Sequence, residues 1–353
     1  MKNSYVFRLV ILLFIAVLFC PQKGLAVAKD QKLIFLTWAE YMPQKLVKDF
    51  EDKHNVDIEF VFFRTEDKRE ELLAQTMGKG FDLILSSGVS ILKYMRLGWL
   101  APIEKSKMPN LKYINPRWKK LRPKIAEYAV PYLWGATGII YRRDKVNEPI
   151  TSWMQLFKPA KVFQERILML HDCGHLTDFA LQALGYSSNS EKMDEIEQAG
   201  QLSLDQKQYV KKYGYFTLQE NSSLLTGECL MATAYNGDAL VLQKMDPRLD
   251  FVVPKEGTEL WMDYILISKY SSKKDLAMQF INYLNEPRNA ASLAAYAQYA
   301  SPNEGAKKYL PAEHLNNPVI YPSQKKIKKS EFNEENSVKK QKRINKICAR
   351  LFN

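Results

Sequence analysis

The segment KLIFLTWAEYMPQKLVKDFEDKHNVDIEFVFF, residues 32–63, decides the fold class. It begins with an apolar run, Lys32–Trp38, which predicts a buried strand. A helix is expected over Pro43–His54, because proline suits its first turn and apolar residues recur there at helical spacing. Apolar residues then alternate over Val56–Phe63, as they do in a half-buried strand. The order strand, helix, strand predicts an α/β unit.

The alternation continues beyond this segment. A helix is predicted over Asp67–Met77, a strand over Phe81–Ser87 and a further helix over residues 90–98. Such repetition is typical of an α/β lobe with a mostly parallel sheet. The pattern changes in residues 129–144, where glycines separate two strand-like runs. We interpret this stretch as a crossover between two lobes.

A second set of strands and helices follows the crossover. Residues 166–170 predict a strand, residues 178–184 a helix, and residues 228–237 a strand that ends in a turn. A further pair of strands is expected within residues 250–268, and two helices within residues 273–299. The whole body is therefore expected to be α/β.

Composition and charge narrow the class of protein. The chain has 353 residues, 46% apolar and 25% charged, as in a folded protein with more than one lobe. Its net charge of +12 lies mainly at the two ends, because residues 1–28 carry +3, residues 323–353 carry +7 and the body carries only +2. A nucleic-acid-binding protein concentrates positive charge on a binding face. The nearly neutral body, without a nucleic-acid-binding motif, argues against that class.

The N-terminus has the layout of a secretory signal peptide. Lys2 and Arg8 precede an apolar run from Leu9 to Cys20, and small residues follow at Ala26 and Ala28. We expect cleavage after residues 1–28, a mature chain that starts near Lys29, and a periplasmic location. An uncleaved N-terminal anchor is the alternative, and the bulky Phe19 before Cys20 argues against a lipoprotein.

The mature chain contains three cysteines, Cys173, Cys229 and Cys348. An odd number leaves at least one unpaired. One disulfide is compatible with an oxidising compartment, but the sequence does not pair the thiols, and buried free thiols are the default expectation.

The basic C-terminal tail is predicted to end in an amphipathic helix. Ile344, Ile347, Cys348 and Leu351 fall on one side of such a helix. We expect it to dock on the body with its lysines outward; a disordered tail and binding to a membrane surface are the alternatives.

Aromatic, polar and acidic residues follow the predicted strands, whereas the common phosphate-binding and catalytic motifs are missing. Ligands of α/β proteins bind at the carboxyl ends of strands. Aromatic faces attract cations, and carboxylates pair with ammonium groups. The pattern predicts a cleft for an elongated aliphatic polycation. These residues are Trp38, Glu40, Tyr41, Ser86, Ser87, Asp172, Tyr235, Asp238, Trp261, Asp263 and Tyr299.

Several segments together resemble one family. LIFLTWAEYMPQKLVKDFE, FDLILSS, VPYLWGATGIIYRRD, TSWMQLFKP, VVPKEGTELWMD and SPNEGAKKYL are similar to segments of the bacterial spermidine/putrescine-binding proteins, which are extracytoplasmic receptors of polyamine ABC transporters. The matches occur in order over residues 32–322. The resemblance implies a two-lobed α/β periplasmic-binding-protein fold with the ligand cleft between the lobes.

The resemblance also implies the domain division and the function. One lobe comprises residues 29–136 with 262–307, and the other comprises residues 137–261 with 308–353. The implied activity is to bind putrescine or spermidine and deliver it to the permease and ATPase subunits of an ABC transporter. We expect a monomer without enzymatic activity, cofactor, metal or nucleic-acid partner.

Carried over position by position, the resemblance assigns aromatic residues that line the polyamine and carboxylates that bind its ammonium groups. The implied ligand-binding residues are Trp38, Tyr41, Ser87, Asp172, His175, Tyr235, Trp261, Asp263 and Tyr299. Further candidates are Glu40, Asp238 and Asn333.

The chain departs from the family pattern at several positions. His175 replaces a second carboxylate, Tyr235 a tryptophan, Val89 a tyrosine and Asn333 a glutamine, while Asp238 is an additional carboxylate. With an unperturbed pKa of about 6.5, an imidazole is expected to be mostly neutral, which removes an ion pair. Losing one charged hydrogen bond costs about 1.5–3 kcal/mol. The preferred amine therefore stays open between putrescine and spermidine.

Three other functions remain to be separated from this one. The first is a receptor of the same fold for another cationic or amino-acid-like solute, and the second is a receptor that also signals. The third is a metal-dependent enzyme that uses His171, Asp172 and His175. The two histidines share a face only in a helix. A predicted strand ends at His171 and Gly174 interrupts a helix, so we expect the pair to straddle a strand–helix junction.

Overall fold

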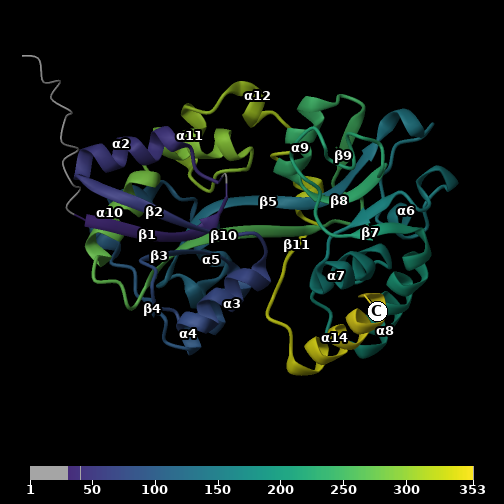
Figure 1. The fold of residues 1–353 in the computed structure, drawn as a ribbon, viewed down its shortest axis with the longest axis horizontal. Coiled ribbons are helices and arrows are strands. Elements are labelled where there is room, and N and C mark those ends of the chain that lie inside the picture. The colour runs from purple at the N-terminus through teal and green to yellow at the C-terminus, as the bar shows by residue number, and fades with distance from the viewer. Residues whose placement is uncertain (1–30, 40, 353) are drawn as a thin grey trace, which may run out of the picture.

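The computed structural model describes residues 31–39 and 41–352, and Figure 1 shows their helices and strands. The predicted signal peptide, residues 1–28, and the candidate Glu40 lie outside the described residues. Among the residues described, no helix is long and apolar enough to span a membrane.

The N-terminal elements form the α/β arrangement that the sequence predicts. Strand β1 pairs in parallel with both β2 and β3, and helix α2 buries its apolar face against this sheet, as its spacing indicates. The elements are β1 (Gln31–Trp38), α2 (Gln44–His54), β2 (Val56–Phe63), α3 (Glu66–Thr76), β3 (Leu83–Ser87), α4 (Gly88–Arg96) and β4 (Leu100–Ala101).

The crossover is one long strand, β5 (Ala129–Arg142), which runs through the middle of the molecule (Figure 1). The prediction of two separate runs was wrong. Gly135 does not break the strand; it leaves room for a neighbour, because a Cβ atom there would lie 2.4 Å from the Trp261 ring. Gly138 likewise allows the backbone of Val252 to approach closely. The glycines therefore mark tight packing inside a strand rather than its end.

Strands β5 and β10 (Glu259–Ser268) connect the two sides of the sheet. Strand β10 runs antiparallel to β3 and to the first half of β5. From Thr137 onward, β5 pairs instead with β8 and β9. The sheet is therefore mixed rather than mostly parallel, because these two long strands run antiparallel to most of their neighbours. The division into lobes at residues 136 and 262 stays a prediction.

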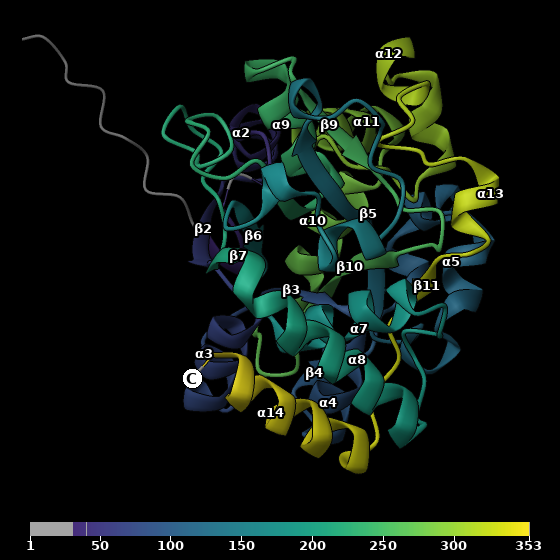
Figure 2. The same cartoon turned by 90° about the vertical axis from the view of Figure 1, so that its right-hand side faces the viewer.

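The other side of the molecule carries the second α/β set (Figures 1 and 2). Strand β6 pairs in parallel with β7 and β8. Asn236 begins helix α9 where the sequence predicted only a turn. The elements are α6 (Met154–Phe157), β6 (Ile167–Met169), α7 (Cys173–Ala183), α8 (Met193–Gln206), β7 (Val210–Tyr213), β8 (Met231–Tyr235), α9 (Asn236–Met245) and β9 (Leu249–Val252).

Helix α7 begins at Cys173, earlier than residues 178–184 had predicted. The Asp172 side chain caps it, because its Oδ1 accepts a hydrogen bond of 3.0 Å from the His175 amide. This cap outweighs the unfavourable Gly174 within the first turn. His175 consequently lies inside the helix, and His171 lies before it, as the predicted junction requires.

The remaining elements complete the outer layers. The helices predicted within residues 273–299 are α10 (Lys274–Leu284) and α11 (Pro287–Ala297). The other elements are α5 (Pro116–Leu121), α12 (Ala312–Leu315), α13 (Gln324–Ile327), β11 (Glu331–Phe332) and short 3₁₀ helices at Lys105–Lys107, Pro109–Tyr113, Pro123–Ile125, Arg143–Lys145, Lys161–Phe163, Lys207–Tyr209 and Glu304–Lys308.

The C-terminal tail forms the predicted amphipathic helix, α14 (Val338–Phe352), which packs on α7 and α8 (Figure 2). Its apolar side is buried, but Lys340 is also buried and donates from Nζ to the Ser188 carbonyl at 2.9 Å. The expectation that all lysines point outward was therefore wrong at this position. A disulfide joins Cys348 to Cys173, so free thiols are the wrong expectation for this pair, whereas Cys229 is free and buried.

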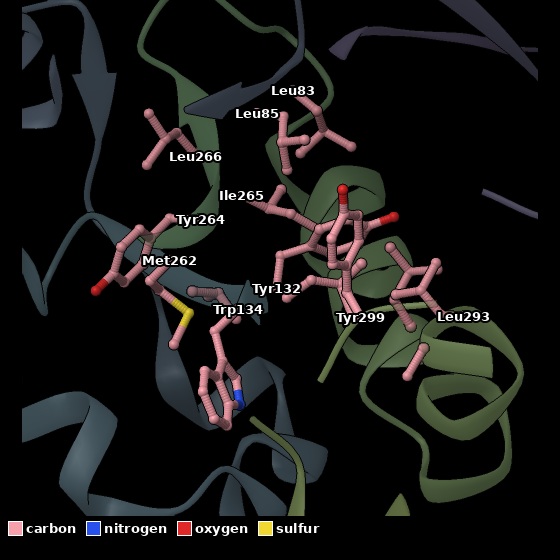
Figure 3. Packing of buried hydrophobic residues seen from close by; sticks show 14 of the residues in the cluster. Leu83, Leu85, Tyr132, Trp134, Met262, Tyr264, Ile265, Leu266, Leu293 and Tyr299 are labelled. Carbon is pink, nitrogen blue, oxygen red and sulfur yellow. The ribbon is translucent and has the colours of Figure 1, made fainter. Parts of the chain in front are cut away.

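A hydrophobic core surrounds β3, β5 and β10 and supports the chain that follows β1. Figure 3 shows Leu85, Tyr132 and Ile265 among its tightly packed side chains. Burying one large apolar side chain stabilises the fold by about 1.5–3 kcal/mol. Tyr132 also donates a hydrogen bond of 2.9 Å to the Tyr41 carbonyl, which fixes the chain just after β1 to this core.

Candidate functional site

A cavity of about 620 Å³ lies between the N-terminal elements and the α7–α9 side of the molecule. Its size is typical of a small-molecule site. It brings the described candidates, except the fully buried Ser86, together from distant parts of the sequence, although their roles in binding stay predictions. They are Trp38, Tyr41, Ser87, Asp172, His175, Tyr235, Asp238, Trp261, Asp263, Tyr299 and Asn333.

Carboxylates outnumber cationic groups in the cavity wall. This imbalance favours a cationic ligand. The acidic lining residues are Glu66, Asp172, Asp178, Asp238, Glu259, Asp263 and Glu334, and the basic ones are Arg64, Arg122 and His175.

Aromatic rings form one part of the wall. The ring of Trp261 meets Tyr299 edge to face at 4.7 Å and Tyr235 at 6.1 Å. The Tyr41 ring lies 5.9 Å from Tyr299. Trp261 Nε1 is buried and has no hydrogen-bond partner among the described residues. We call Tyr41, Tyr235, Trp261 and Tyr299 the aromatic box; their faces can contact a methylene chain or an adjacent cation.

Asp263 of β10 lies against this box and is almost fully buried. It accepts a hydrogen bond of 2.9 Å from the Tyr41 hydroxyl, and it forms no salt bridge with any described residue. Burial, followed by the charge of Glu66, raises the pKa of Asp263 to about 7, against the opposing effect of the Tyr41 hydrogen bond. Such a carboxylate is stabilised by an incoming cation.

Asp238, on the first turn of α9, is a second carboxylate of the same kind. Its Oδ1 accepts a hydrogen bond of 3.0 Å from the Tyr299 hydroxyl. Burial raises its pKa to about 6, although that hydrogen bond lowers it. No described side chain forms a salt bridge with it. Its presence in the cavity agrees with the suggestion that this additional carboxylate faces the cleft.

Ser87 forms a hydrogen bond with an acidic residue that was not predicted from the sequence. Its hydroxyl donates to Glu66 Oε2 at 3.3 Å. The fully buried Arg69 donates to Glu66 Oε1 at 2.8 Å. Glu66 therefore already forms a salt bridge within the protein, whereas Asp238 and Asp263 form none with the residues that the structure describes.

At the other end of the cavity, His175 is paired with Glu259. The His175 Nε2 atom lies 2.8 Å from Glu259 Oε2, and His175 Nδ1 lies 3.5 Å from Asp172 Oδ1. Burial lowers the pKa of His175, but the charges of Glu259 and Asp172 outweigh this effect and raise it to about 10. The expectation of a mostly neutral imidazole was therefore wrong.

Glu259 was not predicted as a site residue, although the alternation of residues along its strand indicates it. Glu259, Trp261 and Asp263 alternate along β10, and alternate residues of a strand share one face. Two of the three were recognised as cleft residues. The same period would have added the third.

Asn333 contacts a buried acid rather than standing alone in the cavity wall. Its Nδ2 donates to Asp178 Oδ2 at 2.9 Å, and its Oδ1 has no partner among the described residues. Burial and the charge of Glu259 raise the pKa of Asp178 to about 8, whereas Lys340 and His175 lower it.

The proposed metal cluster is not supported by the geometry. His171 stacks on Phe352 of α14 with ring centroids 4.2 Å apart, whereas His175 contacts Glu259. Within residues 31–39 and 41–352, no group of three or more histidine, cysteine or acidic side chains is arranged to hold a metal ion.

Comparisons with known proteins agree with this architecture. Residues 45–319 match the family described as bacterial extracellular solute-binding protein. The chain is 30% identical to spermidine/putrescine-binding periplasmic protein 1 of Haemophilus influenzae, covering 89% of this chain and 86% of that protein. It is 29% identical to the spermidine/putrescine-binding periplasmic protein of Salmonella typhimurium, covering 87% of each.

Other similarities are more distant or structural. The norspermidine sensor of Vibrio cholerae is 27% identical, over 86% of this chain and 83% of that protein. A solved structure from Listeria monocytogenes has a TM-score of 0.81 at 27% identity, covering 91% of this chain and 98% of the other. The substrate-binding protein of a Streptococcus pneumoniae ABC transporter has a TM-score of 0.80 at 24% identity, with the same coverage. The expected two-lobed solute-binding-protein fold is thereby confirmed.

Proposed function

Because the chain belongs to the bacterial extracellular solute-binding proteins, we propose that it is a receptor that binds a polyamine and delivers it to an ABC transporter. Family membership groups it with solute-binding proteins rather than enzymes. The names of its relatives, which bind spermidine, putrescine or both, support a polyamine ligand. A periplasmic location, reached through the predicted signal peptide, and partner permease and ATPase subunits are part of the proposal.

The observation that carries the proposal is the pair of carboxylates beside the aromatic box. Asp238 and Asp263 each receive one tyrosine hydroxyl and form no salt bridge among the described residues. A buried carboxylate without a cation is unfavourable unless a ligand supplies the charge. An ammonium group would do so through charge-assisted hydrogen bonds.

The aromatic box suits the remainder of such a ligand. Ring faces cover methylene groups and favour a neighbouring positive charge. We assign Trp261 and Tyr299 to the methylene chain, Asp263 and Asp238 to one ammonium group, and Asp172 to the other end. A charged hydrogen bond contributes about 1.5–3 kcal/mol, which corresponds to about tenfold to hundredfold in affinity.

A ligand panel tests the proposal directly. We expect putrescine or spermidine to raise the melting temperature of the purified mature protein and to bind with measurable heat in calorimetry. Thiamine and arginine represent the alternative cationic and amino-acid-like solutes. Stabilisation by one of these, with no shift for any polyamine, would contradict the proposal and favour a same-fold receptor for another solute.

Delivery to a transporter needs a separate measurement. Deleting the gene should abolish high-affinity uptake of radiolabelled polyamine, and the intact gene should restore it. Binding without any effect on uptake would leave a polyamine receptor but contradict its role in transport, as expected of a receptor that only signals.

A further inference from the structure

The ion pair between His175 and Glu259 forms one end wall of the cavity. Both side chains are largely buried, with 13% and 9% of their surfaces exposed. The His175 Nε2 atom lies 2.8 Å from Glu259 Oε2, which is the distance of a close ion pair. The imidazole also lies near the rings of Phe179 and Tyr235, at 5.9 and 6.1 Å.

The groups that surround this imidazole are predominantly acidic. Asp172 caps the start of α7, Asp178 lies within that helix, and β10 contributes Glu259. A cation of α14, Lys340, acts on Asp178. These charges raise the pKa of His175 to about 10. The ring therefore carries a positive charge throughout the neutral range.

We infer that the His175 imidazolium acts as a built-in cation that takes the place of one ligand ammonium group, so that the cleft selects diamines over triamines. This inference rests on the proposed function and specifies the class of its ligand. His175 and Glu259 are the residues that determine specificity.

The selection follows from the charges that remain for a ligand. At the aromatic box, Asp263 and Asp238 form no salt bridge with any described residue and can accept the first ammonium group. At the other end, Asp172 and Glu259 share one imidazolium, which leaves about one negative charge for a second ammonium group. A third ammonium group would approach the imidazolium and be repelled, because like charges in a desolvated site interact strongly.

The test replaces His175 by glutamine, which removes the charge and keeps a polar side chain. Calorimetry with putrescine and spermidine gives the ratio of the two affinities. We expect the wild-type protein to prefer putrescine, and His175→Gln to shift the ratio about tenfold or more toward spermidine, since one charged interaction changes. The matched control is His171→Gln, on the other side of Asp172, which should leave the ratio unchanged because His171 packs on Phe352.

A second variant gives the opposite sign. Glu259→Gln removes the negative partner and leaves the imidazolium, so that the ratio should move further toward putrescine. NMR titration of the His175 ring supplies an independent readout: its pKa should lie well above the ordinary value of about 6.5 in the wild type and fall in Glu259→Gln. Circular dichroism identifies a variant that fails to fold, in which case the other variant and the wild-type titration decide.

The outcomes separate the two proposals. If the wild type binds no polyamine, the proposed function fails. If it binds polyamines but prefers spermidine, or if both charge variants leave the ratio unchanged, the built-in cation is overturned while the receptor function stands.

Discussion

The two ends of the cavity differ in how the negative charge of their carboxylates is compensated. At the aromatic box, Asp263 and Asp238 each accept a hydrogen bond from a neutral tyrosine hydroxyl and form no salt bridge within the described part of the chain. At the opposite end, Asp172 and Glu259 face a protein cation, His175. Carboxylates without an internal cation are available to a ligand, whereas those with one are partly neutralised. The difference indicates that the number of ligand charges is set by the protein as much as by cavity size.

The two ends also differ in how they are held. Asp263 lies in the middle of the core strand β10, whereas Asp172 precedes a helix that is cross-linked to the C-terminal helix by Cys173 and Cys348. The cross-link closes a loop of 175 residues. Long loops gain the most from closure, because their unfolded chain loses the most entropy.

The largest expected effect is therefore on stability. Cys348→Ala should lower the free energy of unfolding by about 2–5 kcal/mol. Chemical denaturation under oxidising conditions measures this value. The matched control is Cys229→Ala, which removes a buried free thiol and should cost about 1 kcal/mol through lost packing. Equal losses in the two variants, or an unchanged wild type in reducing agent, would show that the cross-link contributes little.

The next effect tests the end without an internal cation. Asp263→Asn keeps the size of the side chain but removes its charge, and should weaken putrescine binding about tenfold to hundredfold, or about 1.5–3 kcal/mol. Calorimetry provides the measurement. Asp194→Asn, on the exposed surface of α8, is the control and should not change the affinity. An unaffected Asp263→Asn variant would remove the basis for distinguishing the two ends.

The two ends should also differ in their response to pH. The pKa values of Asp263 and Asp238, about 7 and 6, lie above the ordinary value of about 3.9. The ligand-free folded state therefore binds more protons than the unfolded state between about pH 4 and 7, and these two groups make its stability fall as the pH rises through that range. Ammonium binding has the opposite sign, because it requires the ionised carboxylates.

We accordingly expect putrescine affinity to be about tenfold lower at pH 6 than at pH 8, as a carboxyl with a pKa near 7 becomes protonated. His175, with a pKa of about 10, does not titrate in that interval. Calorimetry at both pH values, with Asp263→Asn for comparison, provides the test. An equal pH dependence in the wild type and the variant would assign the effect to another group.

Sequence patterns predicted the regular elements better than their connections. Apolar spacing located β1, α2 and β2 closely, because these elements pack against neighbours that are close in the sequence. The continuity of β5 was missed, because Gly135 is explained by a ring from a distant strand, Trp261. The disulfide pairing could not be predicted from the sequence either, because its partners are separated by 175 residues and only the fold brings them together.

The site shows the same limit more sharply. The described candidates other than Ser86 line one cavity, because strand ends and family resemblance both locate side chains reliably. Their charges were harder to predict. An imidazole was expected to be neutral at His175, but a carboxylate from a different element, Glu259, changes that state. Protonation depends on neighbours that are distant in sequence, so residue identity alone does not determine it.

The smallest effect separates the two tyrosine hydroxyls at the aromatic box. Tyr41→Phe removes the hydroxyl that donates to Asp263, and Tyr299→Phe removes the one that donates to Asp238. Each should cost about 0.5–1.5 kcal/mol in putrescine affinity, since a neutral donor is lost while the ring remains.

The two tyrosine variants show whether each hydroxyl acts on the ionisation of its carboxylate or only packs against it. The Tyr41 hydrogen bond lowers the pKa of Asp263, so Tyr41→Phe should raise the pH at which affinity is half lost, whereas Tyr299→Phe should act on the lower titration of Asp238. Binding measured from pH 5 to 8 resolves the two shifts. A loss of affinity without any shift in either midpoint would mean that the hydroxyls only fill space and do not influence the ionisation of the two carboxylates.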